Sequence, residues 1–432
     1  MTDRARYYLE KAVPELEDLE RKGVYDKREI TMIMRRRTDF EHRILGRGSS
    51  TRDYLRYSDF EINVERLRKK RISRLAKAGA VDTKPSISDW AGSRRILFTY
   101  DRGIRKYPGA SELWAAYLRF AKKNGSVKVV YNVYSRLLQL QPRNVEAWLS
   151  AAKYEFETNA NAKGARVLLQ RGLRFNAENP IMWFQYAQFE LTYIYKLLAR
   201  RKVLGLINQS QQKSEMEREE RQLQKKISKG DAAGEHLQDK IELPELQEEE
   251  VKEELSHLPE ADMDMLGNPE TNPALRGDIV LAIFDSCVPA LVNRLPKDSV
   301  LITKRDKTFE IAYAFLNLFD QFEELNRDYL YSHVLQYLQR NYPQDQRTLI
   351  IDITMPIRSA NVDDELLPEL LHLSVNKFIA YKVKSYNTEE RYALTNKFTT
   401  YLNERFTHLS SAKGLDNTTA ILKAIVQKCQ SV

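Results

Sequence analysis

The 432-residue chain contains little cysteine, glycine or proline. Its two cysteines, Cys287 and Cys429, lie far apart in apolar helical surroundings, so we expect reduced structural thiols rather than a disulfide framework or a zinc knuckle. Such thiols are typical of a cytosolic or nuclear protein. With only 16 glycines and 14 prolines, the composition favours helices and argues against a β-sandwich or a β-barrel.

Features typical of membrane proteins and enzymes are also missing from the sequence. No apolar run approaches the roughly 20 residues that span a bilayer, and the N-terminal MTDRARYYLE has no hydrophobic signal core. The six histidines are not paired at helical spacing, and the glycine-rich 46–50 stretch lacks the lysine of a phosphate loop, so we interpret it as a helix-capping turn. No acidic pair stands on a recognisable catalytic frame. The sequence therefore predicts no enzyme, no cofactor and no metal site.

The chain does contain a repeat led by tryptophan. Trp114, Trp148 and Trp183 are separated by 34 and 35 residues. Aromatic or small residues follow each of them at steps of three or four, which places them all on one helix face. Burial in a core explains this spacing better than stacking on nucleic-acid bases. The aromatic residues assigned to this repeat core are Trp114, Tyr117, Phe120, Trp148, Tyr154, Trp183, Tyr186 and Phe189.

Amphipathic second helices accompany these tryptophan-led helices. They carry an arginine at the same steps of 34 and 35 residues, at Arg102, Arg136 and Arg171, and Pro108 and Pro142 close two of them. Units of about 34 residues with two helices each are the signature of a helical solenoid, in which only the stack of units buries a core. The predicted fold class is therefore all-α, an α-solenoid of helix pairs.

Acidic residues recur with the same period. Glu155 and Glu190 follow two of the tryptophans by seven residues, and Arg136 and Arg171 lie on second helices. Because these charges repeat with the structural period, we interpret them as ion pairs between helices that set the register of the stack rather than as ligand-binding groups.

The aromatic pattern extends beyond the three tryptophans. It occurs earlier with tyrosine in place of tryptophan, at Tyr54, Tyr57 and Phe60, and again in a divergent form near 316–323. Between these parts the sequence becomes rich in Gln, Lys, Glu and Arg, as in a flexible or exposed charged insertion. The predicted organisation is N-terminal helices over 1–48, a repeat solenoid over 49–208, a charged insertion over 209–258 and a helical repeat-like domain over 259–432. Within the first part, the apolar spacing predicts one helix over 4–22 and a second from about residue 26 to 45.

Positive charge is concentrated near the N-terminus. The formal net charge is +9, and residues 35–74 alone contain 13 Lys and Arg against 6 Asp and Glu. Such a patch predicts contact with RNA or with an acidic protein partner, although a solvated helix face and a role in nuclear entry stay open. The candidate contact residues are Arg35, Arg36, Arg37, Arg66, Arg68, Lys69, Lys70 and Arg71.

The repeat resembles a known family over about residues 50–190. The tryptophans are followed by Phe or Tyr and usually Glu, and proline follows the second helix, which differs from the tetratricopeptide consensus. This pattern is similar to the half-a-tetratricopeptide (HAT) repeat. Because HAT proteins occur almost only in RNA-processing assemblies, the resemblance implies an RNA-processing scaffold. An mRNA 3′-end-processing or splicing scaffold and a direct RNA-binding module are the alternatives.

Three further stretches narrow the resemblance. They are the segment from 7–10 through 38–43, the segment 200–208 (RKVLGLIN after Arg200), and the segment 267–279 (GNPETNPALRGDI). Together they resemble a family of HAT-repeat subunits of the small-subunit processome. The resemblance implies a nucleolar scaffold in the processing of precursor rRNA to 18S rRNA and in 40S subunit assembly. Implied partners are WD-repeat propeller proteins, other processome proteins, precursor rRNA and the guide small nucleolar RNA.

Overall fold

The structure is a computed structural model of the full chain. It describes residues 2–78, 85–203, 272–293, 303–322, 325–360, 367–384, 388–407, 424 and 427. All regular secondary structure in these ranges is helical, which confirms the predicted all-α helical-repeat class. The chain forms two compact units, an N-terminal unit (Met1–Ala147) and a C-terminal unit (Trp148–Val432). Within the described ranges, no helix is long and apolar enough to cross a membrane.

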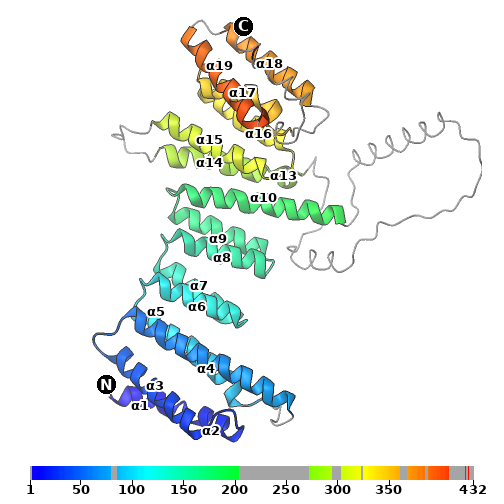
Figure 1. Ribbon diagram of the computed structural model, residues 1–432. Coiled ribbons are helices and arrows are strands. Elements are labelled where there is room, and N and C mark those ends of the chain that lie inside the picture. The colour runs from blue at the N-terminus through cyan, green and yellow to red at the C-terminus, as the bar shows by residue number, and fades with distance from the viewer. Residues whose placement is uncertain are drawn as a thin grey trace, which may run out of the picture. The chain divides into compact units, whose positions relative to one another are not determined.

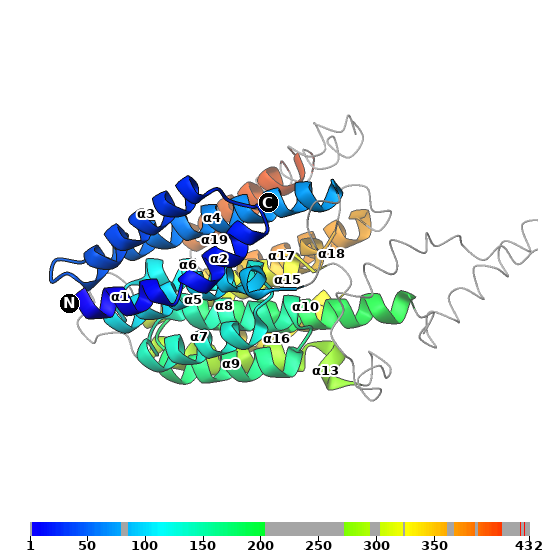
Figure 2. The same cartoon turned by 90° about the horizontal axis from the view of Figure 1, so that it is seen from below.

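Antiparallel helices build the N-terminal unit, and most of them pack against their neighbours in the chain (Figure 1). Helix α2 packs against its neighbour α3 and also against α5, which is not adjacent to it in the chain. Figure 2 shows α3 and α4, which are in contact, lying side by side. The helices of this unit are α1 (Thr2–Glu10), α2 (Val13–Arg21), α3 (Lys27–Leu45), α4 (Thr51–Lys77), α5 (Ile87–Lys106), α6 (Ser111–Lys123) and α7 (Val127–Leu140).

The predicted helix over 4–22 is wrong in one respect, because it is interrupted. Helix α1 ends at Glu10, and α2 begins at Val13 with Pro14 in its first turn. Proline has no amide hydrogen to donate and its ring clashes with the preceding turn, so it suits a helix start and not a helix interior. The break frees α2 to bury Leu16 and Leu19 in a core cluster with Val24 and Tyr25.

The C-terminal unit follows the same pattern of stacked helices. Helices α9, α10, α14, α15, α16, α17 and α18 pack in that order, each against the next. Its elements are α8 (Val145–Lys153), a π-helical turn η1 (Tyr154–Thr158), α9 (Ala162–Phe175), α10 (Pro180–Val203), α13 (Pro273–Arg276), α14 (Asp278–Val292), α15 (Lys304–Asp320), α16 (Arg327–Asn341), α17 (Gln346–Arg358), α18 (Leu367–Lys384), α19 (Thr388–Leu402) and η3 (Asn403–Thr407).

Helix α14 packs directly on α10, although some 70 residues separate them in the sequence. The chain thus resumes after the charged segment at the next layer of the same stack. The predicted insertion over 209–258 lies outside the described residues, and the predicted domain boundaries stay predictions. Beyond α16, the helices α17, α18, α19 and η3 share a second core that includes Phe378, Phe398 and Phe406.

The tryptophans that lead the repeats are buried. Trp114 is 1% exposed, Trp148 4% and Trp183 9%, whereas the fourth tryptophan, Trp90, is 51% exposed. The indole Nε1 of Trp114 donates to the carbonyl oxygen of residue 108, and Trp183 donates to residue 177, both six residues earlier. The ring therefore fills the core while its polar edge ties down the preceding turn. Proline is suited to that turn in the first case, since only its carbonyl is used.

The other members of the predicted repeat core are buried or half-buried, except for Pro108. Tyr54, Tyr57, Tyr117, Tyr154 and Tyr186 are buried. Phe60, Phe120 and Phe189 are half-buried, Pro142 is half-buried and Pro108 is exposed. Their rings contact the neighbouring helix, as in the stacked pairs Phe40–Tyr57 and Tyr100–Tyr117. The residues thus form the inter-helix core that the period predicts, and their assignment to HAT repeats specifically stays a prediction.

Candidate nucleic-acid interface

The basic residues singled out from the sequence lie on two helices of the N-terminal unit. Arg35, Arg36 and Arg37 are on α3, and the remainder are on the second half of α4. Both helices begin with a capping box, Asp26 with Glu29 on α3 and Ser50 with Asp53 on α4. These caps satisfy the first amide groups of each helix and fix where it starts. The faces that the basic residues occupy are therefore set by helix geometry.

Arg37 points into the unit and is 1% exposed. Its Nε and Nη2 donate to the two carboxylate oxygens of Glu61 on α4, at 2.7 and 2.9 Å. Arg95 on α5 also reaches Glu61 and donates to Glu15 on α2. Burial alone would raise the pKa of Glu61, but the charges of Arg37 and Arg95 outweigh it and hold this pKa below its usual value. Four helices are thus joined by a buried network of ionised groups.

Arg68 occupies a second buried site, which is 4% exposed. It donates to both oxygens of Glu65, one turn earlier, and to Asp89 near the start of α5. Burial would lower the pKa of the guanidinium, but the hydrogen bond and charge of Glu65 raise it, so the group stays ionised. Asp89 also caps α5 by accepting from the amide of Ser86.

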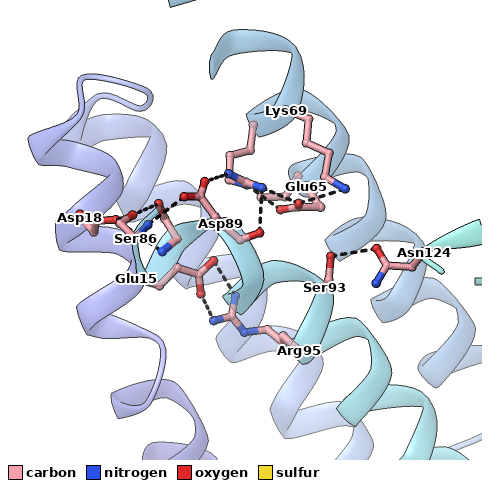
Figure 3. Close-up of polar contacts among 12 residues, drawn as sticks. Glu15, Asp18, Glu65, Lys69, Ser86, Asp89, Ser93, Arg95 and Asn124 are labelled. Carbon is pink, nitrogen blue, oxygen red and sulfur yellow. Dashed lines mark hydrogen bonds and ion pairs between the residues drawn. The ribbon is translucent and has the colours of Figure 1, made fainter. Parts of the chain in front are cut away.

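The N-terminal end of α5 is hydrogen-bonded to α2 beside Arg68. The Ser86 hydroxyl donates to Asp18 on α2, and Lys22 donates to Ser88. Figure 3 shows Asp18, Ser86, Asp89 and Glu65 in one continuous chain of polar contacts. Hydrogen bonds between serine hydroxyls and charged side chains therefore join the start of α5 to α2.

Arg71 is half-buried and holds α4 against α3. Its two Nη atoms donate to the two oxygens of Glu29, each at 2.7 Å, and one of them also donates to the carbonyl of Val24. Hydrogen bonds from Arg71 and from the Asp26 amide lower the pKa of Glu29 to about 2. This bidentate pair stays formed through the neutral pH range.

These contacts change the interpretation of the eight basic residues that the sequence predicted as ligand contacts. The hypothesis that Arg37 and Arg68 contact RNA or an acidic partner is corrected, because their guanidinium groups are buried and already used inside the unit. Arg71 is also paired inside the unit but is only half-buried, and its predicted contact stays a prediction. A residue that is 1% or 4% exposed presents no surface to a ligand. The other five candidates are exposed, and their predicted contact stays a prediction: Arg35, Arg36, Arg66, Lys69 and Lys70.

Two of the four residues in the predicted repeat ion pairs, Glu190 and Arg136, form ion pairs, and their partners differ from those predicted. Glu190 is fully buried and accepts two hydrogen bonds of 2.7 Å from Arg166 on α9, whereas Arg171 on the same helix is exposed. Arg136 pairs with Asp101, 35 residues earlier. Glu155 accepts from the side chain of Asn161 just after its own helix.

One recurrent spacing could have identified the correct partners. Arg166 precedes Glu190 by 24 residues, and Arg37 precedes Glu61 by the same 24 residues. Both glutamates stand seven positions after the aromatic residue that opens their helix. Arg37 therefore stands at the position equivalent to Arg166, and its membership of a triple-arginine run concealed this from sequence reasoning. Glu15 and Arg95 were not predicted, because no sequence period links them to their partners.

Within the described residues, no group of three His, Cys, Asp or Glu side chains could hold a metal ion. Cys287 lies fully buried in α14, where burial raises the pKa of its thiol to about 12, so it stays protonated. Cys429 lies outside the described residues. The exposed Arg and Lys residues of α3 and α4 are the chemically distinctive surface of the N-terminal unit, and we call them its basic face.

The fold and this face define an α-helical repeat protein with a basic N-terminal unit. Residues 9–95 match the family model described as U3 small nucleolar RNA-associated protein 6. This range includes the buried network of Glu15, Arg37, Glu61 and Arg95. The chain is 41% identical over 204 residues to the Schizosaccharomyces pombe protein of that name. It is 31% identical over 189 residues to the human homolog. These matches confirm the resemblance that the sequence stretches predict: the chain is similar to proteins named U3 small nucleolar RNA-associated protein 6.

The matches cover only part of each protein. The alignment with the fission-yeast relative spans 47% of this chain and 41% of the relative. The alignment with the human homolog spans 44% of this chain and 31% of the homolog. The chain thus matches less than half of the length of these relatives.

Proposed function

We propose that the chain is a non-enzymatic scaffold of the U3-containing small-subunit processome. In this role it serves the nucleolar processing of precursor rRNA to 18S rRNA and the assembly of the 40S subunit. The observation that carries the proposal is the match of residues 9–95, together with the 41% identity to a protein named for its association with U3 small nucleolar RNA. A stack of helix pairs supports it, because such a stack offers long surfaces to several partners at once.

The proposed partners are of two kinds. The protein partners are WD-repeat propeller proteins and other proteins of the processome. The nucleic-acid partners are precursor rRNA and U3 small nucleolar RNA, and the exposed cations of the N-terminal unit are where we expect contact. The proposed location is the nucleus and the nucleolus.

A HAT scaffold of mRNA 3′-end processing or splicing is the second candidate. It shares the helical-repeat architecture, so the fold does not discriminate between the two. The names of the relatives favour the processome, because three of them, from fission yeast, mouse and human, carry the same U3-associated name.

The test is purification of the tagged full chain from cells under mild conditions, followed by sequencing of the bound RNA. We expect enrichment of U3 small nucleolar RNA and the precursor rRNA leader over cells that express the tag alone. Enrichment of spliceosomal RNA or of mRNA 3′ ends without either of these would contradict the proposal. Cross-linking before a second, denaturing purification separates RNA that touches the chain from RNA held by its partners.

A further inference from the structure

We propose that the outward face of the second half of α4 binds the sugar-phosphate backbone of double-helical RNA. The inference deepens the proposed function and rests on it, because it assigns one surface of the scaffold to the RNA of the particle. The binding residues are Arg66, Lys69, Lys70, Arg74 and Lys77, and we call them the α4 stripe. All five are exposed.

Helix geometry places the five side chains together. At about 100° per residue, they fall within an arc of about 140° on one side of α4. From the first to the last they extend over eleven residues, about 16 Å along the axis. The sequence from 66 to 78 contains no acidic residue, so the stripe carries its positive charge without internal compensation.

The opposite side of the same helix is anchored in the unit. Arg68 is held by Glu65 and Asp89, and Arg71 is held by Glu29. The contacts of Arg68 with Asp89 on α5 and of Arg71 with Glu29 on α3 fix the rotation of α4 about its axis, so the stripe is held facing outward. The seven Lys and Arg residues between positions 66 and 77 therefore divide into two groups. Arg68 and Arg71 position the helix, and the five residues of the α4 stripe are accessible to a ligand.

The stripe is almost free of internal partners. Lys69 lies 3.6 Å from Glu65, which already pairs with Arg68. Arg66, Lys70, Arg74 and Lys77 form no ion pair with any residue that the structure describes. Five adjacent like charges repel one another, and a polyanion that neutralises them releases its own counterions.

The composition of the face favours RNA over an acidic protein. The core of a protein interface is depleted in charge and is anchored by aromatic or aliphatic side chains. Helix α4 has no aromatic residue after Phe60, and between 66 and 77 only Leu67, at the edge of the stripe, is an exposed large apolar residue. A row of cations without anchors fits a ligand whose surface is a row of phosphates.

The same composition favours a double helix over a single strand. Proteins that bind single-stranded RNA combine cations with aromatic rings on which unpaired bases stack. The stripe offers no such ring, whereas a double helix keeps its bases stacked internally and is recognised through its phosphates and 2′-hydroxyl groups. We therefore expect binding that depends on helical shape and salt and not on base sequence.

The test uses the full chain and a fluorescently labelled 20-base-pair RNA duplex, with affinity measured by anisotropy between 50 and 300 mM salt. The triple variant Arg66→Gln, Lys70→Gln, Arg74→Gln is the test protein. Because about 0.9 counterions are released per phosphate contact, we expect its salt slope to fall by about 2–3. At 100 mM salt we expect its affinity to be at least about tenfold weaker.

A matched control removes the same amount of charge elsewhere in the unit. The variant Arg119→Gln, Lys123→Gln, Lys128→Gln changes three exposed cations of α6 and α7. We expect its duplex affinity to stay within about twofold of the parent chain. An equal loss in both triple variants would overturn the proposal, because the binding would then depend on net charge alone.

Two further outcomes would also overturn it. One is tighter binding of a single strand of the same sequence than of the duplex. The other is binding of polyglutamate, which mimics an acidic protein, without binding of the duplex. If the duplex does not bind while U3 RNA still co-purifies from cells, the inference fails and the proposed scaffold function stands.

Discussion

At the scale of single residues, two tryptophans of the N-terminal unit have opposite environments. Trp114 is 1% exposed and its indole is hydrogen-bonded, whereas Trp90 is 51% exposed on α5. Both stand in helices, and both look equally suited to a core by residue type. What separates them is the period, because Trp90 lies outside the steps of 34 and 35 residues.

This difference gives a stability prediction. We expect Trp114→Ala to lower the free energy of unfolding by about 3–5 kcal/mol, because it removes a ring from the core and leaves a cavity. The exposed Trp90→Ala serves as the control and should cost less than about 0.5 kcal/mol. Urea unfolding followed by circular dichroism measures both. Similar losses for the two variants would contradict the stacked-helix core.

The same comparison explains what residue-level reasoning could predict. Burial of the repeat aromatics followed from their period, and so did the presence of charges between helices. The partner of each charge did not follow, because α9 carries three arginines, and only the geometry places Arg166 opposite Glu190. The triple-arginine run in α3 was likewise misleading, since residues adjacent in a helix point about 100° apart.

At the scale of helices, close approach depends on two glycines. Gly103 on α5 lies against the ring of Tyr54, and Gly172 on α9 lies against the ring of Trp148. Each glycine directly follows a repeat arginine, and each touched ring opens the aromatic pattern of its unit. A Cβ at residue 172 would stand 3.0 Å from the Trp148 ring and 2.3 Å from the Met182 Cε atom.

We therefore expect Gly172→Ala to destabilise the chain. Overpacking costs about 1–3 kcal/mol, which exceeds the roughly 0.5–1 kcal/mol that alanine gains over glycine in a helix. Gly109→Ala is the control, because a Cβ there meets no atom within 4 Å. The comparison is a shift in thermal midpoint. A midpoint for Gly172→Ala at or above that of the parent would show that α9 does not approach the tryptophan closely.

Helix boundaries were predicted well where caps or breakers mark them. The helix expected from about residue 26 to 45 matches α3, and its capping box is visible in the sequence. The break between α1 and α2 was missed, because the apolar period continues across it. Pro14 was the available signal, since proline favours a helix start over a helix interior.

At the scale of the whole molecule, the family match and the ion network coincide. Residues 9–95 match the family model, and the buried contacts of Glu15, Arg37, Glu61 and Arg95 fall within that range. The matched segment is thus the part of the chain in which α2 and α3 are joined to α4 and α5. The sequence predicted a helical repeat and its basic face, whereas the closed network depends on long-range pairs that no local pattern reveals.

The central claim is that the basic run divides into cations that build the fold and cations that face outward. Its most direct test compares two neighbours of the same type, Arg36→Ala and Arg37→Ala, by urea unfolding of the full chain. Arg37 is buried and its loss leaves Glu61 without its bidentate partner, so we predict a loss of about 3–5 kcal/mol. Arg36 is exposed, and we predict a change within about 0.5 kcal/mol. Equal effects of the two substitutions would contradict the account.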